Sequence, residues 1–524
     1  MAHKDVIFGW RSRLQTVSGA TLALIAMGIL TRLITSMTQI VIAREFGLSL
    51  LSDAYFATEN VPELFMGFVV VGLSMVFIPA FTGYRVTQGE DEAWRFASSF
   101  FFLSAFVSFI VAMIAAVGAP LLVSVMAPGF HGLARQTAIK LVRIMSLSIV
   151  FFGLDAGVRG LLQSHKAFIV PELARVAYNS VLFVFALTLG GGYGVFVLAW
   201  GIVLGAALQL TIQLLGAVKR DVFKLVWVLG HPGVKQAAKQ FVPFIIAISG
   251  IQITFVLDRM VASGLAEGSV TALTYAQRII LLPVGLFALP LRTTLYPDLS
   301  AWAARSQLHQ LAEAILWGLK VLLFLVIPSC VGLVVLSTPL IQLLFERGAF
   351  DSLATLATSK ALICYAAGVP SIAAILVLNN VYLSLGNARS LAKLSVLNWL
   401  ANLSLSLLLS HYLGYYGIAL GTSVSVTLTM ILMIYFLKRR QLKAFDVKSL
   451  LSSAYRIASV SALMGLQLAL LVIMSNHISV QSQLHYQFLR IAILIFIGTS
   501  TYLVIGRWLK LDGLAMLSKT LHKS

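Results

Sequence analysis

Apolar runs of about 20 residues recur along this 524-residue chain, and each is long enough to cross a bilayer as a helix. Lipid offers no water partners to backbone groups, so only helices and closed barrels can span a membrane. The runs are continuous rather than alternating, which excludes a barrel. Only 11% of the residues are charged, about half the share in soluble domains. The sequence therefore predicts an all-α polytopic membrane protein with about 14 transmembrane helices.

The predicted spans form two sets of six and a final pair. They lie near 17–43, 61–83, 96–126, 139–163, 168–189 and 193–218, then near 241–264, 273–297, 312–336, 361–385, 390–411 and 415–437, and last near 453–475 and 487–508. The two sets repeat weakly at an offset of about 221 residues. The matching segments include Val61-Pro62 with Leu282-Pro283, Gly129-Phe130 with Gly348-Ala349-Phe350, and Tyr193-Gly194-Val195 with Tyr416-Gly417-Ile418.

This repeat predicts the domain organisation. Residues 1–220 form an N-lobe, 221–240 a cytoplasmic linker, 241–440 a C-lobe, and 441–524 a C-terminal helix pair with a basic tail. Because each lobe has an even number of spans, both enter the membrane in the same orientation. Two such lobes are parallel pseudo-repeats about an axis along the membrane normal, and the natural binding site is the cleft between them.

The formal charge of +19 is explained by membrane topology rather than by nucleic-acid binding. With the N-terminus in the cytoplasm, about 24 Lys and Arg fall on the inner side and about 4 in outer loops, as the positive-inside rule requires. Both termini are then cytoplasmic. No phosphate-binding loop, zinc-protease motif or Cys/His metal spacing is present. We expect a transporter rather than an enzyme, with no cofactor, driven by an ion gradient, the membrane potential or the substrate gradient.

Charged side chains within the spans are candidates for function, because burying them in lipid is costly. Arg32 and Arg278 lie in the spans that open the two halves of the cleft, and two facing arginines suit an anionic, phosphate-bearing substrate. The alternative is two separate structural ion pairs, one of them between Arg32 and Asp53. Asp155 and Arg159, four residues apart, are expected to form an internal ion pair. Arg175 and Arg292 are assigned to the cytoplasmic interface, where long side chains reach the lipid headgroups.

Several motifs resemble those of the MurJ/MviN lipid II flippase family, within the superfamily of multidrug, oligosaccharidyl-lipid and polysaccharide exporters. They span nearly the whole chain. The motifs are Thr31-Arg32, Ala43-Arg44-Glu45-Phe46-Gly47, Ser52-Asp53-Ala54-Tyr55-Phe56, Phe77-Ile78-Pro79-Ala80-Phe81, Ala127-Pro128-Gly129-Phe130, Gly268-Ser269-Val270, Tyr275-Ala276-Gln277-Arg278 and Phe345-Glu346-Arg347-Gly348-Ala349-Phe350.

The resemblance implies two six-helix lobes around a cationic cavity and a lipid-lined groove on the last two helices. It places Arg32, Asp53 and Arg278 where the family's cavity charges fall. The chain departs from the family's pattern at other cavity positions that usually carry charge. These are Thr38 and Met66, where arginines are usual, and Gln277 and Leu281, where acidic residues are usual.

The resemblance implies outward flipping of a polyprenyl-pyrophosphate-linked saccharide across the bacterial cytoplasmic (inner) membrane by alternating access, with lipid II for peptidoglycan synthesis as the favoured cargo. The expected partners are this lipid-linked glycan, membrane lipids and cell-wall synthesis enzymes, with no nucleic acid, and the protein is expected to be a monomer. Two alternatives stay open. One is export of another lipid-linked glycan or amphipathic molecule on the same scaffold. The other is a transport-inactive scaffold protein that organises envelope enzymes.

A cation site is predicted in the C-lobe. Asp258, Asn398, Asn402 and Thr422 supply a carboxylate, two amides and a hydroxyl, which are hard oxygen ligands suited to a small cation. Sodium is the favoured coupling ion, and a proton on Asp258 would serve the same purpose. The alternative is that Asp258 pairs with Arg259 and that the two asparagines join neighbouring helices by hydrogen bonds.

Overall fold

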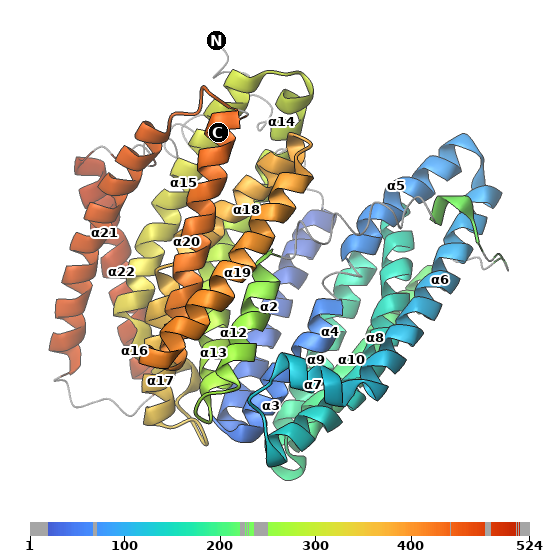
Figure 1. The fold of residues 1–524 in the computed structure, drawn as a ribbon, viewed down its shortest axis with the longest axis horizontal. Helices are drawn as coiled ribbons and strands as arrows, with labels where there is room; N and C mark the ends of the chain where they lie inside the picture. Colours follow the sequence, from blue (N-terminus) through green and yellow to red (C-terminus); the bar gives the residue numbers. More distant parts are fainter. Residues whose placement is uncertain are drawn as a thin grey trace.

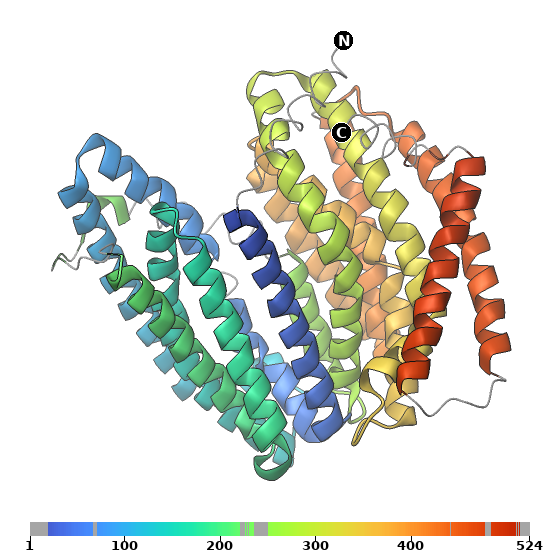
Figure 2. The same cartoon turned by 180° about the vertical axis from the view of Figure 1, so that it is seen from behind.

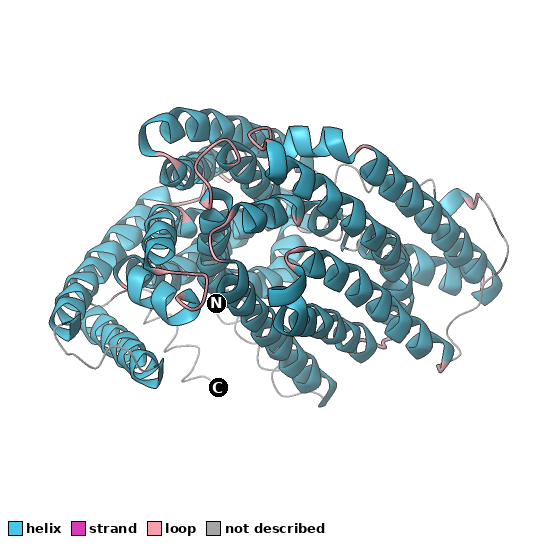
Figure 3. Ribbon diagram, turned by 90° about the horizontal axis from the view of Figure 1, so that it is seen from below, coloured by secondary structure: helices cyan, strands magenta, loops and turns pink. Residues whose placement is uncertain are grey.

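The computed structural model describes residues 19–65, 71–220, 250–440, 442–476 and 484–509, together with residues 226, 228, 230–234, 511 and 513. Every regular element in these residues is a helix, as Figure 3 shows. Two lobes lie side by side, and a helix pair, α21 (Val447–Asn476) and α22 (Leu484–Trp508), lies at the outer side of the C-lobe (Figures 1 and 2). The predicted all-α, multi-span architecture is confirmed.

The helices of the two lobes follow each other in a closely similar order. The N-lobe contains α2 (Gly19–Phe46), α3 (Leu50–Thr58), α4 (Asn60–Phe65), α5 (Val71–Thr87), α6 (Glu90–Val117), α7 (Ala119–Met126), α8 (Gly132–Ser164), α9 (Ile169–Tyr193) and α10 (Phe196–Val218). The C-lobe contains α12 (Gly250–Ala262), α13 (Ser269–Pro283), the π-helix η2 (Val284–Ala288), α14 (Leu289–Ala304), α15 (Leu308–Val335), α16 (Ser337–Phe345), α17 (Ser352–Ala366), α18 (Val369–Ser384), α19 (Ala388–Leu413) and α20 (Tyr415–Arg440).

Within the described residues, 11 helices are long and apolar enough to cross a membrane, or up to 12 when α17 and α18, bent by 48°, count as one span. The remaining two predicted spans border residues outside the described ranges. Span 61–83 falls on α4 and α5, which flank 66–70, and span 241–264 falls on α12, which follows 235–249. The described part of the predicted linker packs on α6, where Ser99 Oγ accepts hydrogen bonds from the backbone N–H groups of Gly230 and His231 at 3.1 and 3.0 Å.

The second span of each lobe is interrupted near a proline. In the N-lobe the helix breaks between α3 and α4, just before Pro62. In the C-lobe α13 ends at Pro283 and continues as the π-helix η2 before α14. Proline removes one backbone hydrogen bond from a helix, and π-segments are frequent at functional sites. The two equivalent spans therefore share a break in their backbone hydrogen bonding.

Four loops at one end of the molecule join the lobes by reciprocal contacts, and we call this region the clasp (residues 44–50, 127–130, 263–268 and 346–350). In the N-lobe, the loop after α7 donates a hydrogen bond from Gly129 N to Ser263 Oγ at 3.2 Å. In the C-lobe, the equivalent loop after α16 donates from Ala349 N to the carbonyl oxygen of Arg44 at 2.8 Å. The predicted repeat between these loops thus has a structural counterpart, because each loop contacts the opposite lobe.

Glycine makes this close approach possible. A Cβ on Gly129 would lie 2.3 Å from Gly264 Cα, and one on Gly348 would lie 2.4 Å from the carbonyl oxygen of Arg44. Both neighbours are backbone atoms, which cannot turn aside as a side chain can. A larger residue at either position would therefore push the lobes apart.

We predict that Gly348→Ala lowers the melting temperature of the purified protein more than Gly414→Ala does. Both glycines have a positive φ, +60° and +63°, so both substitutions carry a backbone penalty of about 1–2 kcal/mol. Only Gly348 also faces the opposite lobe, whereas nothing lies within 4 Å of the Cβ position at Gly414. Thermal unfolding in detergent measures the difference, and equal losses would show that the clasp does not contribute to stability.

Candidate functional site

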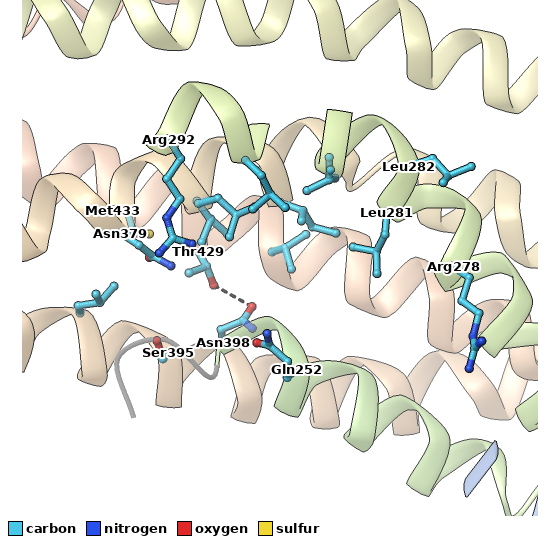
Figure 4. Close-up of a pocket in the computed structure, with 18 of the residues that line it drawn as sticks. Gln252, Arg278, Leu281, Leu282, Arg292, Asn379, Ser395, Asn398, Thr429 and Met433 are labelled. Atoms are coloured by element: carbon cyan, nitrogen blue, oxygen red, sulfur yellow. Dashed lines mark hydrogen bonds between the residues drawn. The ribbon is translucent and has the colours of Figure 1, made fainter. Parts of the chain in front are cut away.

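A pocket of about 610 Å³ lies between α2 and the C-lobe, within the usual size range for ligand sites. Its N-lobe wall is one face of α2. Its C-lobe wall comes from α12 to α14 and from α18 to α20. The polar lining residues are Thr31, Thr35, Ser36, Gln39, Gln252, Asn379, Ser395, Asn398 and Thr429, and several of them are visible in Figure 4. The wall is therefore rich in hydroxyl and amide groups, between leucines and valines.

The charge of this pocket has a single sign. Arg32, Arg278 and Arg292 line it, and the described lining residues include no aspartate or glutamate. A low-dielectric wall strengthens the field of such charges and attracts anions. The arrangement favours a ligand with at least one negatively charged group.

Arg32 lies against the backbone of the π-helix. A Cβ on Gly285 would be 3.0 Å from Arg32 Nη1 and 3.2 Å from Nη2, so the missing side chain at Gly285 makes room for the guanidinium. Among the described residues Arg32 has no ion pair, and its side chain is exposed to the pocket. The predicted cavity position of Arg32 agrees with this geometry, and the alternative ion pair with Asp53 does not form.

Arg278 lines the pocket and also joins the two lobes. Its Nη2 donates to Glu59 Oε2 at 2.7 Å, and its guanidinium lies 5.3 Å from the ring centre of Phe56. The carboxylate of Glu59 also accepts from the Tyr55 hydroxyl at 3.3 Å. A buried pair of this kind is costly to break by removing one partner, by about 3–5 kcal/mol. Arg278 therefore has a structural role in addition to its place in the pocket, and Glu59 is a partner that the sequence did not indicate.

Asp53 does not lie in the pocket, which corrects its assignment as a substrate-binding residue. Its carboxylate accepts from Gly268 N at 2.7 Å, Thr271 N at 2.8 Å and Thr271 Oγ1 at 2.6 Å. Two of these donors are backbone amide groups at the start of α13, which no carbonyl of its own helix satisfies, and the third is the Thr271 hydroxyl. Asp53 thus caps a helix of the opposite lobe.

The positions that depart from the family's pattern differ in their surroundings. Thr38 is buried, and its hydroxyl donates to the carbonyl of Ile34 at 2.8 Å. Leu281 lines the pocket with an apolar side chain. Gln277 is buried and faces the interior of the C-lobe, where its amide donates to the Tyr365 hydroxyl at 2.8 Å. Met66 lies outside the described residues. Thr38, Gln277 and Leu281 are all uncharged, so these positions do not supply the cavity charges that the family's pattern has there.

A second polar cluster lies inside the C-lobe, around Asp258. One carboxylate oxygen accepts from Asn402 Nδ2 at 3.1 Å, and the other accepts from the Tyr365 hydroxyl at 2.7 Å. The Thr422 hydroxyl lies 2.7 Å from both oxygens. Asp258 is completely buried and forms no ion pair with Arg259, which instead bonds the carbonyl of Phe56 at 3.1 Å. No cationic side chain forms an ion pair with this carboxylate in the described parts of the chain.

Three of the four predicted cation ligands meet in this cluster, and Asn398 does not. Asn398 donates to Thr254 Oγ1 at 2.9 Å and accepts from Thr429 Oγ1 at 3.0 Å. Asn398 is one helical turn from Asn402, so its amide lies about one turn away from the Asp258 cluster. There it lines the pocket (Figure 4). The prediction that Asn398 joins the cation site is therefore corrected, and Tyr365 and Gln277 are cluster members that the sequence did not indicate.

Two amide oxygens beside Asp258 have no partner. Asn402 Oδ1 and Gln277 Oε1 are buried without a hydrogen bond in the described structure. A buried acceptor left unpaired costs about 1–3 kcal/mol. A carboxylate with two free amide oxygens and a hydroxyl nearby is a donor set that fits a small hard cation.

The N-lobe holds a buried polar network of its own. The predicted ion pair forms, with 3.6 Å between Arg159 Nε and Asp155 Oδ2. Gln213 from α10 donates to the other carboxylate oxygen of Asp155, and Glu172 from α9 lies 3.8 Å from Arg159. These contacts join three helices around one charge pair, which supports a structural role.

Two helical lobes, a cationic pocket between them and a clasp at one end define a polytopic membrane transporter. The sequence model of the family described as "Lipid II flippase MurJ" matches residues 42–489. This chain belongs to that family.

Relatives and solved structures agree with this assignment. A "Lipid II flippase MurJ" from Burkholderia cenocepacia is 29% identical over 438 residues, which cover 82% of this chain and 83% of the relative. A "Probable lipid II flippase MurJ" from Vibrio cholerae is 27% identical, covering 78% and 80%. A solved structure described as "Lipid II flippase MurJ, inward closed conformation" matches with a TM-score of 0.77 and 25% identity, covering 93% of this chain and 99% of that one.

The same fold also occurs in proteins outside this family. An inward-facing multidrug resistance MATE family transporter of the MOP superfamily matches with a TM-score of 0.68 and 16% identity, covering 81% of this chain and 98% of that chain. At this identity the likeness concerns the fold alone. The shared part is the two-lobe scaffold, and the cargo depends on the residues that line the pocket.

Proposed function

We propose that this protein flips lipid II from the inner to the outer leaflet of the bacterial cytoplasmic membrane by alternating access. The observation that carries the proposal is the pocket between the lobes of a MurJ family member, lined by three arginines and by no described acidic residue. The pyrophosphate of a polyprenyl-linked saccharide is an anion that must leave water to cross a membrane. Arginine binds such a group through two parallel hydrogen bonds and stays charged in the site.

Different lining residues suit different parts of the proposed cargo. Arg32, which has no ion-pair partner among the described residues, supplies charge for the pyrophosphate. Hydroxyl and amide groups such as Ser36, Gln252 and Asn398 suit a saccharide, which presents many hydroxyl groups. The leucines of the wall add apolar surface. A ligand with one strongly anionic part and one polyhydroxyl part matches this lining.

Alternating access is supported by the clasp and the breaks in the equivalent spans. Inter-lobe hydrogen bonds gather at one end of the molecule, and they include the cap of α13 by Asp53 and the Arg278–Glu59 ion pair. A neutral bond is worth about 0.5–1.5 kcal/mol net and one to a charged group about 1.5–3 kcal/mol, so the set can hold one end closed and still be broken by cargo or ion binding. Opening this end while the other end closes would expose the pocket to the opposite leaflet.

The coupling ion is proposed to reach Asp258. The carboxylate has no cationic partner in the described structure, and Asn402 and Thr422 surround it. Na⁺ held by Asp258, Asn402 and Gln277 would satisfy the unpaired amide oxygens, and a proton on Asp258 would remove the buried charge instead. Either event changes the contacts between α12, α13, α19 and α20, which carry these residues.

The cellular setting follows from the same proposal. Both termini lie in the cytoplasm, as the distribution of Lys and Arg predicts. The protein works as a monomer, contacts membrane lipids and receives its cargo from cell-wall synthesis enzymes. A second candidate cargo, another polyprenyl-linked glycan, is favoured by Thr38 and Leu281, which replace charged residues of the family's pattern and alter the contacts available to a headgroup.

The Arg32→Gln variant tests the proposed site. We expect it to insert normally and to fail in a cell depleted of its own lipid II flippase, because a charged hydrogen bond is worth about 1.5–3 kcal/mol, or roughly ten- to a hundredfold in binding. Arg456→Gln is the matched control, since Arg456 lies on α21 outside the pocket and bonds Ser452. Growth restored fully by Arg32→Gln would remove Arg32 from the site, and failure of the wild-type chain to restore growth would reject lipid II as cargo.

A disulfide between the lobes, next to the clasp, tests alternating access. The hydroxyl oxygens of Ser52 and Thr271 lie 3.1 Å apart on opposite lobes, so cysteines at both positions are placed to form a disulfide. We expect oxidised Ser52→Cys/Thr271→Cys protein to lose transport in vesicles and to regain it after reduction, while each single variant stays active. Normal transport at complete crosslinking would contradict opening of the clasp.

Sodium-dependent stability tests the coupling site. We expect the melting temperature to rise with NaCl and not with choline chloride at equal ionic strength, because an ion that binds the folded state stabilises it by mass action. Asp258→Asn and Asn402→Ala should abolish the rise, whereas Asn398→Ala, one turn away and bonded elsewhere, should keep it. Identical curves in both salts would exclude Na⁺, and wild-type transport by Asp258→Asn would exclude the proton as well.

A further inference from the structure

The position of Arg292 differs from the one expected from the sequence. The sequence assigned this residue to the lipid headgroups, but its side chain is half-buried and lines the pocket. Figure 4 shows its guanidinium turned inward, near Thr429 and Asn379. A charge that could have reached the membrane surface is instead held against the cavity, where an unpaired cation is costly.

Asn380 on α18 fixes this orientation. Arg292 Nε donates to Asn380 Oδ1 at 3.0 Å, and Asn380 Nδ2 donates back to the backbone carbonyl of Arg292 at 3.1 Å. This reciprocal pair uses one of the five N–H groups of the guanidinium. The two terminal nitrogens have no hydrogen bond to any described residue, and Arg292 has no acidic partner there. The side chain is thus oriented by a neutral group, and its charge stays available to a ligand.

The three guanidinium groups are spaced along α13, η2 and α14, with that of Arg32 reaching η2 from α2 on the other wall. Arg32 lies at Gly285, which is seven residues after Arg278 and seven before Arg292 in the sequence. At the rise of a helix, seven residues correspond to roughly 10 Å, so Arg278 and Arg292 are roughly 20 Å apart along α13, η2 and α14. Figure 4 shows these two at opposite ends of the pocket. A single phosphate group cannot contact both of them at once.

We infer that Arg292, oriented by Asn380, is a second oxyanion-binding position of the pocket, separate from the one at Arg32 and Arg278. This inference rests on the proposed function, since it concerns the same lipid-linked cargo. The oxyanion comes from one of two sources with the same chemistry. It is either the pyrophosphate at another stage of its passage or a carboxylate of the peptide on the saccharide. In both cases Arg292 provides charge at the end of the pocket away from the clasp.

Binding to the purified full-length protein tests this position with three probes. Lipid II carries both kinds of oxyanion, undecaprenyl pyrophosphate carries only the pyrophosphate, and soluble muramyl pentapeptide carries only carboxylates. The variants are Arg292→Gln, Arg292→Lys and Asn380→Ala, with Arg456→Gln as a control outside the pocket. Melting temperatures are measured on the same samples, so that a loss of folding is distinguished from a loss of binding.

We expect Arg292→Gln to weaken lipid II binding at least tenfold with an unchanged melting temperature, and Arg292→Lys to weaken it less because the charge remains. Asn380→Ala should fall between the wild type and Arg292→Gln, since it only frees the guanidinium to turn. A parallel loss for undecaprenyl pyrophosphate identifies the pyrophosphate as the ligand of Arg292. A loss for lipid II and muramyl pentapeptide alone identifies the carboxylate.

Wild-type affinity of Arg292→Gln for all three probes would overturn the inference and leave the proposed function standing. The proposed function fails in a different way, when the wild-type protein does not bind lipid II. In that case a loss of undecaprenyl pyrophosphate binding in Arg292→Gln would still support the oxyanion position for a different cargo. Wild-type protein that binds none of the probes would reject both.

Discussion

Every ionisable side chain inside a bilayer needs a partner, and the described charges of this protein divide into those that have one within the chain and those that do not. Asp53, Glu59 with Arg278, and Asp155 with Arg159 are joined to groups on other helices. Arg32 and Arg292 face a pocket, and Asp258 is surrounded by neutral donors. The satisfied charges connect helices and lobes. The others leave room for a charge from outside, which in our proposal is the cargo anion beside the arginines and a coupling cation beside Asp258.

The parallel repeat explains why the clasp is reciprocal. Two lobes in the same orientation, related by an axis along the membrane normal, place equivalent loops on opposite sides of that axis. The loop at Gly129 therefore reaches the C-lobe as the loop at Gly348 reaches the N-lobe. Backbone atoms in direct contact cannot deform gradually, because packed interfaces are bistable rather than elastic. The clasp is consequently suited to two states, joined or separated.

The sequence predicted the parts of this structure that depend on local pattern. Long apolar runs define the helices, and motif spacing located Arg32, Arg278 and three members of the Asp258 cluster. The sequence did not predict the direction in which a side chain points, and this direction determines which groups the side chain contacts. Asp53 is close in sequence to cavity residues, yet its carboxylate turns to the amides of α13. Asn398 and Asn402 share a face by spacing, but their partners lie in different layers. Arg292 was misplaced because no sequence rule shows that Asn380, 88 residues away, holds it inward.

Arg278 lines the pocket and also pairs with Glu59 of the opposite lobe, and this double position has an energetic consequence. A guanidinium that donates two hydrogen bonds to a phosphate has fewer N–H groups to offer Glu59, whose Oε2 lies 2.7 Å from Nη2. Cargo and Glu59 are then competitors for one donor. Cargo binding at Arg278 therefore weakens the contact with Glu59 that joins the lobes. By reciprocity, the contact between the lobes lowers the affinity for cargo. The loaded pocket would thus weaken its own closure, so that arrival of the headgroup is itself the signal to open.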